Sequence, residues 1–484
     1  MTPGGGRSAA PTAARAVGQQ IMAGRSGPRC PDPPRADNDF AKLSHRVERV
    51  TSISYPLAER TLANGLRVIV SEDHAVPNVA VNLWVGVGSR HEAPGRTGFA
   101  HLFEHLMFQG SRNVASGEHF SALMDEGARL NATTWFDRTN YFETVPTGAL
   151  DLALWLEADR HGYLLDAVNQ ENLDNQRDVV KEEKRQRYDN VPYGTALIDI
   201  YATAFPADHP YHHPTIGSME DLDAATVEDV HAFYRAHYGP NNTVLTLVGD
   251  VTPEDGFAAA ERYFGHLPAI ERHERPRLPQ LAPLTAPVRL DRVGDVPNDR
   301  LYVAFRLPVD TTPEYHASQV AVDVLGGLAS SRLIRRLVRR DETAVAVGGW
   351  TMGLVDGVGL GAFTVDVAEG ADVERIEEVL CEEITALAEH GPDAEEMESV
   401  VADTERSWLS ALASIEERAD HISHHALLTG DPGYVNAFVD HVRAVTPDDV
   451  RAVTAAWLAP ESRAVVRYLA EPGATAGDEG EEAA

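Results

Sequence analysis

Apolar and polar residues alternate along several short stretches of the chain, which is the spacing of strands in a sheet. These stretches are Leu66–Val70, Val81–Val87, Thr243–Val248, Leu301–Leu307, Leu360–Val367 and Ala464–Tyr468. In 227–238 and 373–389 apolar residues instead recur every three or four positions, which predicts amphipathic helices. Because the helices lie between strands that need not be parallel, we expect an α+β fold of mostly antiparallel sheets with packed helices.

The chain also contains a repeat of itself. Thr226-Val-Glu-Asp-Val230, followed by Pro240, returns 220 residues later as Thr446-Pro-Asp-Asp-Val450, followed by Pro460. The same offset places the strand 81–87 on 301–307, and an offset of 219 places 101–106 on 320–325. A repeat at a fixed spacing indicates a duplicated structural unit. We therefore predict two similar lobes that form a clam-like chamber.

Composition marks where the lobes begin and end. Residues 267–288 hold five prolines and no apolar periodicity, which is typical of an interdomain linker between lobes at 49–266 and 289–470. Residues 1–48 are predicted to be a disordered leader and 471–484 a disordered acidic tail. The leader is also compatible with an organelle transit segment or with a translation start at Met22.

Charge and composition exclude some classes of partner. The formal net charge of −32 would repel a phosphate backbone, so nucleic acid is not an expected partner. No apolar run reaches the roughly 18 residues that a membrane span needs. Cys30 and Cys381 are too few for a disulfide framework, and no secretory signal precedes them. We expect a cytoplasmic location.

Residues 98–110 (GFAHLFEHLMFQG) predict a buried helix that carries metal-ligating residue types. His101 and His105 are one turn apart on one face, where two imidazoles can bind one ion, and Glu104 shares that face. A carboxylate beside zinc-bound water can take its proton, so H-x-x-E-H supplies two ligands and a base. The alternative is a pair of helix histidines satisfied by ordinary hydrogen bonds.

A third ligand should be an acid on another element. Residues 171–187 predict a helix whose inner face carries Leu173, Gln176, Val180 and Glu183, whereas Glu182 projects about 100° away. The alternative is that the charges of 181–184 form a solvated face.

Together these motifs resemble the inverted-motif zinc peptidases, the family of pitrilysin, insulinase and the mitochondrial processing peptidase. The resemblance covers about 55–468 and includes the bacterial processing-peptidase-like branch. It rests on the duplicated lobes and on four segments: His101–His105, Leu130–Thr134 with Thr139–Tyr141, Arg177–Glu183 and Tyr188–Gly194. By resemblance, His101, His105 and Glu183 bind one Zn²⁺ per chain, and Glu104 is the general base.

The resemblance implies further roles. Asn131 and Ala132, in a predicted strand at 130–136, would offer backbone hydrogen bonds to an extended peptide, although an ordinary interior strand is the alternative. Gln176 would orient a metal ligand by hydrogen bonding. In the second lobe Val320 and Val324 replace both histidines, so no metal site is expected there.

One feature of the family is missing from this chain. Relatives use an Arg and Tyr pair from the C-terminal lobe, yet no Tyr occurs between Tyr315 and Tyr434. The arginines of SSRLIRRLVRR (330–340) fit a solvated face, and His212-His213 and His424-His425 fit surface pairs better than metal ligands. We expect a homologous subunit to supply the pair, in a heterodimer or a homodimer.

The predicted function is therefore zinc-dependent endopeptidase activity on oligopeptides or unfolded segments held between the lobes. Two alternatives remain. One is a non-catalytic scaffold subunit of a heterodimeric complex, and the other is a peptidase that removes targeting leaders.

Overall fold

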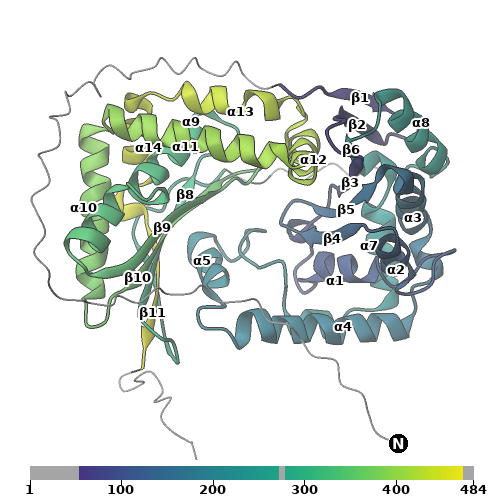
Figure 1. Ribbon diagram of the computed structural model, residues 1–484. Coiled ribbons are helices and arrows are strands. Elements are labelled where there is room, and N and C mark those ends of the chain that lie inside the picture. Colours follow the sequence, from purple (N-terminus) through teal and green to yellow (C-terminus); the bar gives the residue numbers. More distant parts are fainter. Residues whose placement is uncertain (1–53, 272–277, 279, 472–484) are drawn as a thin grey trace, which may run out of the picture. The chain divides into compact units, whose positions relative to one another are not determined.

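The computed structural model describes residues 54–271, 278 and 280–471 (Figure 1). The described residues belong to one compact unit. The predicted leader at 1–48 lies outside the described residues, as do the predicted tail after Glu471 and positions 272–277 and 279 of the predicted linker. In the described part, no helix is long and apolar enough to cross a membrane.

Each half of the chain builds its own sheet. The strands of the first half are β1 (Ala58–Thr61), β2 (Arg67–Glu72), β3 (Asn78–Val85), β4 (Arg129–Thr134), β5 (Thr139–Pro146) and β6 (Thr243–Gly249). Those of the second half are β7 (Val288–Gly294), β8 (Arg300–Leu307), β9 (Ala344–Met352), β10 (Gly359–Val367) and β11 (Ala464–Ala470). The sheet orders are β1-β2-β6-β3-β5-β4 and β7-β11-β8-β10-β9. Only the pairs β2–β6 and β7–β11 within these two sheets are parallel.

The two sheets confirm the predicted duplication. Without β1, the first sheet has the same strand order as the second, and the single parallel pair occupies the same place in both. The repeated helix start is also the same in both halves. Thr226 accepts a hydrogen bond from the N–H of Asp229 at 3.2 Å, and Thr446 accepts one from Asp449 at 3.2 Å. Both are capping boxes.

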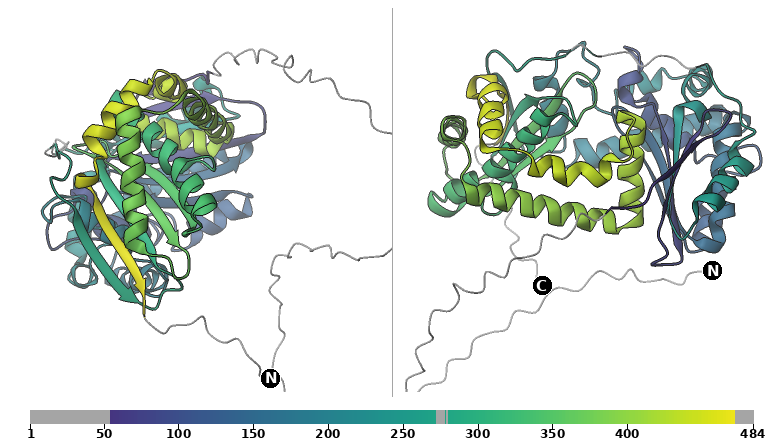
Figure 2. Two further views of the ribbon diagram at one scale, coloured as in Figure 1. Left: turned by 90° about the vertical axis from the view of Figure 1, so that its left-hand side faces the viewer. Right: turned by 90° about the horizontal axis from the view of Figure 1, so that it is seen from above.

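Helices cover the sheets. The helices of the first half are α1 (Phe99–Leu106), α2 (Glu118–Asp125), α3 (Leu150–Tyr163), α4 (Gln170–Lys184), α5 (Ala196–Ala204), α6 (Met219–Asp223), α7 (Val227–His237) and α8 (Pro253–Phe264). Those of the second half are α9 (Pro313–Val322), α10 (Val373–His390), α11 (Ala394–Ala413), α12 (Ile415–His424), α13 (Tyr434–Arg443) and α14 (Pro447–Trp457). Helices α3 and α8 pack on one face of the first sheet, and α9, α10 and α14 on one face of the second. Figure 2 shows α10 in green in front of the second sheet.

The opposite face of each sheet is covered by a helix from the other half. Ala419 and Ile422 of α12 pack against Ile69, Ala80 and Val244 of the first sheet. In return, α5 packs against the second sheet at β8 and β11, and Figure 1 shows both helices beside the sheet of the opposite half. The two helices are equivalents in the repeat, since α12 begins 219 residues after α5.

This exchange explains why several strands are apolar on both faces. Leu301, Val303 and Phe305 of β8 point to the helices of their own half, whereas Tyr302 and Ala304 point to α5. A sheet that is covered on both sides needs apolar residues on both sides. The α+β class and the two similar, mostly antiparallel lobes are thus confirmed, and the enclosed chamber stays a prediction.

Candidate metal centre

Helix α1 carries the two histidines and the glutamate of the motif. Its apolar side chains are buried in a core shared with β4, β5, α4 and α7, and these residues are Phe99, Leu102, Phe103 and Leu106. Burial of this stripe leaves His101, Glu104 and His105 partly accessible. The predicted helix at 98–110 therefore exists, and its ordered α-helical part ends at Leu106.

The N-terminus of α1 is held by a buried carboxylate. Glu92 accepts hydrogen bonds from the backbone N–H groups of Gly98 at 2.9 Å and Ala100 at 2.7 Å, and its side chain is fully buried. His213 Nε2 lies 3.1 Å from Glu92 and 3.0 Å from the carbonyl of Ser89. A negative charge at this end of a helix satisfies its free N–H groups and complements the helix dipole. Glu92 thereby fixes the turn that carries His101.

Helix α4 carries the predicted third ligand. Asn169 caps it, accepting hydrogen bonds from the N–H groups of Glu171 at 2.9 Å and Asn172 at 3.1 Å. Leu173, Gln176 and Val180 are buried, so the inner face is the one that the sequence predicted. Glu183 lies one turn further along, and the helix continues as a π-helical turn over 185–189.

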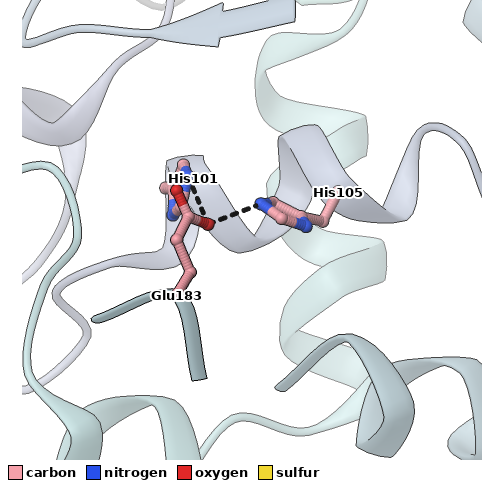
Figure 3. A group of neighbouring side chains, drawn as sticks. All are labelled: His101, His105 and Glu183. Atoms are coloured by element: carbon pink, nitrogen blue, oxygen red, sulfur yellow. Dashed lines mark ion pairs between the residues drawn. The ribbon is translucent and has the colours of Figure 1, made fainter. Parts of the chain in front are cut away.

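The structure brings the three predicted ligands together (Figure 3). Glu183 Oε2 lies 3.3 Å from His105 Nε2 and 3.7 Å from His101 Nε2. One ligand atom from each residue lies within 4.8 Å of the others, and among the described residues no other such group of three exists. Two imidazoles and a carboxylate are a donor set that Zn²⁺ commonly takes.

The electrostatics of the group favour a bound cation. Burial, together with the charge of His105, lowers the pKa of His101 to about 4, so its imidazole is neutral at neutral pH. Burial would raise the pKa of Glu183, but the hydrogen bond from His105 and neighbouring positive charge, including that of Arg187, lower it overall. Within the described residues, His101 Nδ1 is buried without a hydrogen-bond partner. A neutral imidazole beside an ionised carboxylate is the state in which both bind metal.

The adjacent acids Glu182 and Glu183 have different neighbours. Arg187 Nη1 lies 2.6 Å from the second oxygen of Glu183. Glu182 is exposed and instead pairs with Arg185 at 3.0 Å and Gln186 at 2.9 Å. The 181–184 segment is thus only partly the solvated face of the alternative interpretation.

Glu104 faces strand β4. The hydroxyl of Thr134 on β4 donates a hydrogen bond to Glu104 Oε2 at 2.5 Å. Burial raises the pKa of Glu104, and the Thr134 hydrogen bond opposes that rise. A base with a raised pKa retains a proton more readily once it has taken one.

Strand β4 is the edge strand of the first sheet, paired only with β5 among the described strands. Asn131 is exposed and Ala132 is buried. The N–H of Ala132 donates to the side-chain oxygen of Asn131 at 2.9 Å. The edge of β4 that the sequence predicts to bind a peptide therefore has no neighbouring strand among the described residues. A peptide that paired with Ala132 would have to displace the hydrogen bond between Ala132 and Asn131.

Other predicted residues take defined places. Gln176 is buried beside His105. Burial lowers the pKa of His105, but the hydrogen bond to Glu183 and a weaker one to Gln176 help to raise it overall. Val320 and Val324 lie in the core of the second half.

The interpretation of 330–340 as a solvated basic face is wrong in part. Arg332 pairs with Glu396 at 2.6 Å, and Arg336 pairs with Glu382 at 2.6 Å and Glu383 at 3.0 Å. Nor are the paired histidines simply surface groups, because His213 contacts Glu92 and His425 is buried. The acids that pair with these arginines lie on other helices, which local periodicity cannot reveal.

Sequence reasoning missed two polar residues that contact α1, Glu92 at its start and Thr134 at Glu104. Glu92 lies in a polar loop, SRHEAPGRTG, where nothing distinguishes it from a solvated acid. Thr134 lies in the same predicted strand as Asn131 and Ala132, and this closeness in the sequence is the signal that could have identified it.

Comparisons with known proteins agree with this architecture. A family model described as insulinase (peptidase family M16) matches residues 67–216, and one described as the peptidase M16 inactive domain matches residues 224–403. The zinc protease PqqE of Helicobacter pylori is 32% identical over 304 residues, which cover 61% of this chain and 67% of that protein. An uncharacterised zinc protease of Streptomyces coelicolor is 27% identical over 402 residues, or 81% of this chain and 85% of that protein.

Solved structures share the fold. The crystal structure of a protease from Helicobacter pylori has a TM-score of 0.80 at 24% identity and covers 86% of this chain and 100% of that one. A structure from Pseudomonas fluorescens described as a peptidase M16 inactive domain has a TM-score of 0.74 at 18% identity, with 86% and 98% covered.

Proposed function

Because the chain belongs to the insulinase family of peptidases (peptidase family M16), we propose that it is a zinc-dependent endopeptidase acting on oligopeptides or unfolded segments. The observation that carries the proposal is the grouping of His101, His105 and Glu183, with Glu104 on the same helix as the two histidines. The names of the relatives, which are zinc proteases, support the same metal.

The chemistry follows from the positions of the side chains. A zinc ion held by two imidazoles and a carboxylate supplies Lewis acidity toward water and toward the scissile carbonyl. Glu104 takes a proton from the attacking water and returns it to the leaving amine. Thr134 fixes the direction of the Glu104 carboxylate through Oε2. Gln176, buried behind His105, fixes that imidazole.

The substrate would lie along β4. An extended peptide can add to an unpaired strand edge through main-chain hydrogen bonds, with Asn131 and Ala132 beside it. An unfolded segment fits such an edge well, because its backbone N–H and C=O groups are free along its whole length.

A second subunit completes the proposed site. Tyr315 and Tyr434, which bracket the region without tyrosine, are both buried, and Tyr434 is hydrogen-bonded to His316 at 2.5 Å. Neither is available to hold a substrate carbonyl. We expect a homologous subunit to supply the Arg and Tyr pair, so activity should rise when that subunit is added to the purified chain.

The test is cleavage of a pool of quenched-fluorescent peptides by the zinc-loaded chain, alone and with its homologous partner. Glu104→Gln should lower kcat roughly 100-fold or more, because it removes the base while leaving the ligands in place. A chelator should abolish cleavage. Cleavage that survives both changes would rule out the proposed mechanism.

The same experiment separates the alternatives. A zinc-free chain that associates with a partner and never cleaves would be a scaffold. Cleavage of a precursor at one site, without cleavage of the random pool, would instead identify a leader-processing peptidase.

A further inference from the structure

Asp420 links the second half of the chain to the substrate strand. It lies on α12, the helix that the second half places on the first sheet. Its Oδ1 accepts three hydrogen bonds, from Asn82 Nδ2 at 3.2 Å, Trp84 Nε1 at 3.0 Å and Asn140 Nδ2 at 3.1 Å. These donors belong to β3 and β5, so one carboxylate oxygen contacts two neighbouring strands of the first sheet.

Asn140 transmits this contact toward β4. Its side-chain oxygen accepts hydrogen bonds from Thr133 Oγ1 at 2.5 Å and Arg138 Nη1 at 3.1 Å. A carboxylate can only accept and a guanidinium can only donate, so Asp420 on one side and Arg138 on the other allow a single orientation of the Asn140 amide. That orientation presents an acceptor to Thr133.

Arg138 closes the network. Its Nη1 also donates to the backbone carbonyl of Thr133 at 2.9 Å and to the Thr133 hydroxyl at 2.5 Å, and the guanidinium lies 4.8 Å from the centre of the Trp84 ring. Burial lowers the pKa of Arg138, and the charge of Asp420 is the strongest interaction opposing that effect, followed by Glu104. Asp420 is therefore the main counter-charge of the half-buried Arg138, which contacts Thr133 of β4.

Thr133 connects this network to the proposed general base. It pairs with Asn140 across β4 and β5, and its neighbour Thr134 donates to the general base Glu104. We propose that Asp420 is a positioning residue of the peptidase, which fixes β4 for binding of the extended peptide through Asn140, Arg138 and Thr133. The half without a metal site would thus take part in substrate binding. This inference rests on the proposed function and extends it.

The experiment measures peptide binding separately from hydrolysis. Fluorescein-labelled casein is titrated into the zinc-loaded full chain in a Glu104→Gln background, and binding is followed by fluorescence anisotropy. Asp420→Asn should raise the Kd roughly ten-fold with unchanged zinc content, because it removes the charged acceptor of Asn140 and the counter-charge of Arg138. Glu417→Gln, an exposed residue one turn earlier on α12, is the matched control and should bind as the parent does.

A second substitution tests the route of the effect. Thr133→Val removes the hydroxyl that Asn140 holds and should raise the Kd to a similar extent. Because both changes break one network, the double variant should be no weaker than either single variant, whereas independent effects would multiply. Multiplying effects, or an unchanged Kd in folded Asp420→Asn, would overturn the proposal.

Two further outcomes are decisive. If Asp420→Asn does not fold, Asp420→Glu keeps the charge and displaces the carboxylate by one methylene, and binding unchanged from the parent would then count against the proposal. If the chain with an intact Glu104 binds casein but never cleaves it, even after its homologous partner is added, the proposed peptidase activity fails, while the role of Asp420 in peptide binding is still supported. A parent that does not bind casein overturns the inference.

Discussion

Glu183 and Glu182 are adjacent acids with opposite surroundings. Glu183 lies within 3.3 Å of His105, whereas Glu182 is exposed and paired with Arg185. The difference arises because neighbouring residues of a helix project about 100° apart. One residue is therefore placed to bind metal and the other to stay in solvent.

We predict that Glu183→Gln lowers zinc affinity at least ten-fold, because it removes the anionic ligand of the site. Glu182→Gln changes the net charge by the same amount and should leave zinc affinity within two-fold. Competition with a chromophoric chelator measures both affinities. Equal losses in the two variants would contradict the assignment of Glu183 as a ligand.

A buried group of titratable residues lies where β5 meets α2 and α3. Burial, and then the charge of Glu157, raise the pKa of Glu143 well above its ordinary value. Burial lowers the pKa of His119 to about 3 and that of His161 to about 4. At neutral pH both histidines are therefore neutral in the folded chain.

The signs of these shifts predict a stability maximum near pH 6.5. Below pH 6.5 the unfolded chain protonates His119 and His161 while the folded chain does not, so stability falls with falling pH. Glu143 acts in the opposite sense, because the unfolded chain ionises it above pH 4.5 while the folded chain keeps its proton. Its contribution to stability is lost as pH rises.

Replacement of Glu143 tests this sign. Glu143→Gln keeps the shape of the neutral carboxyl but cannot ionise, so we expect the Tm at pH 8 to rise by about 1–3 °C. At pH 5 the Tm should change less. Thermal unfolding followed by circular dichroism measures both values, and a lower Tm at pH 8 would show that Glu143 is ionised in the folded chain.

At the scale of elements, α1 depends on a residue that lies outside it. Glu92 precedes the helix by a loop, yet it accepts hydrogen bonds from the N–H groups of Gly98 and Ala100. Gly98 and Gly217 both have positive φ, at 86° and 69°, and a Cβ on Gly217 would lie 2.2 Å from the Cα of Gly98. The helix start is thus held by charge and by close backbone packing.

We expect Glu92→Gln to weaken zinc binding roughly ten-fold, because an amide places a donor against at least one backbone N–H and so loosens the turn that carries His101. Glu126→Gln, an exposed acid after α2, is the matched control. Isothermal titration of the metal-free protein with zinc measures the change. Wild-type affinity in Glu92→Gln would show that α1 needs no external cap.

At the scale of the whole molecule, the two halves hold each other by exchanged helices. Asp199 of α5 accepts hydrogen bonds from Arg292 Nη2 at 2.6 Å and Tyr468 at 2.8 Å on the second sheet. Asp420 of α12 in turn accepts hydrogen bonds from Asn82, Trp84 and Asn140 of the first sheet. Each half therefore covers an apolar sheet face of the other half and contacts that sheet through an aspartate.

This arrangement predicts that the halves stay together when the chain is cut. A protease site inserted between Leu267 and Val288 should be cleaved without separating the fragments on size-exclusion chromatography at low salt or high salt. Each half expressed alone should aggregate, because it would expose the face that the exchanged helix covers. Separation of the cut fragments would show that the helix exchange is weaker than the contacts suggest.

Local sequence patterns determined a large part of this protein. The spacing of His101, Glu104 and His105, the inner face of α4 that ends in Glu183, and the duplication of the fold all follow from periodicities of two, three or four residues and from the repeat. These features could be predicted because each depends on residues that are neighbours along the chain or equivalents in the duplication.

Only the tertiary structure decided which helix covers which sheet and which polar groups, distant in the sequence, contact one another. Asp420 lies 336 residues from Trp84 in the sequence, and Glu92 lies 121 residues from His213. No periodicity links such distant positions, and an acid that will be buried looks the same in the sequence as an acid that will be solvated. Their roles arise from burial, which only the packing of the folded chain determines.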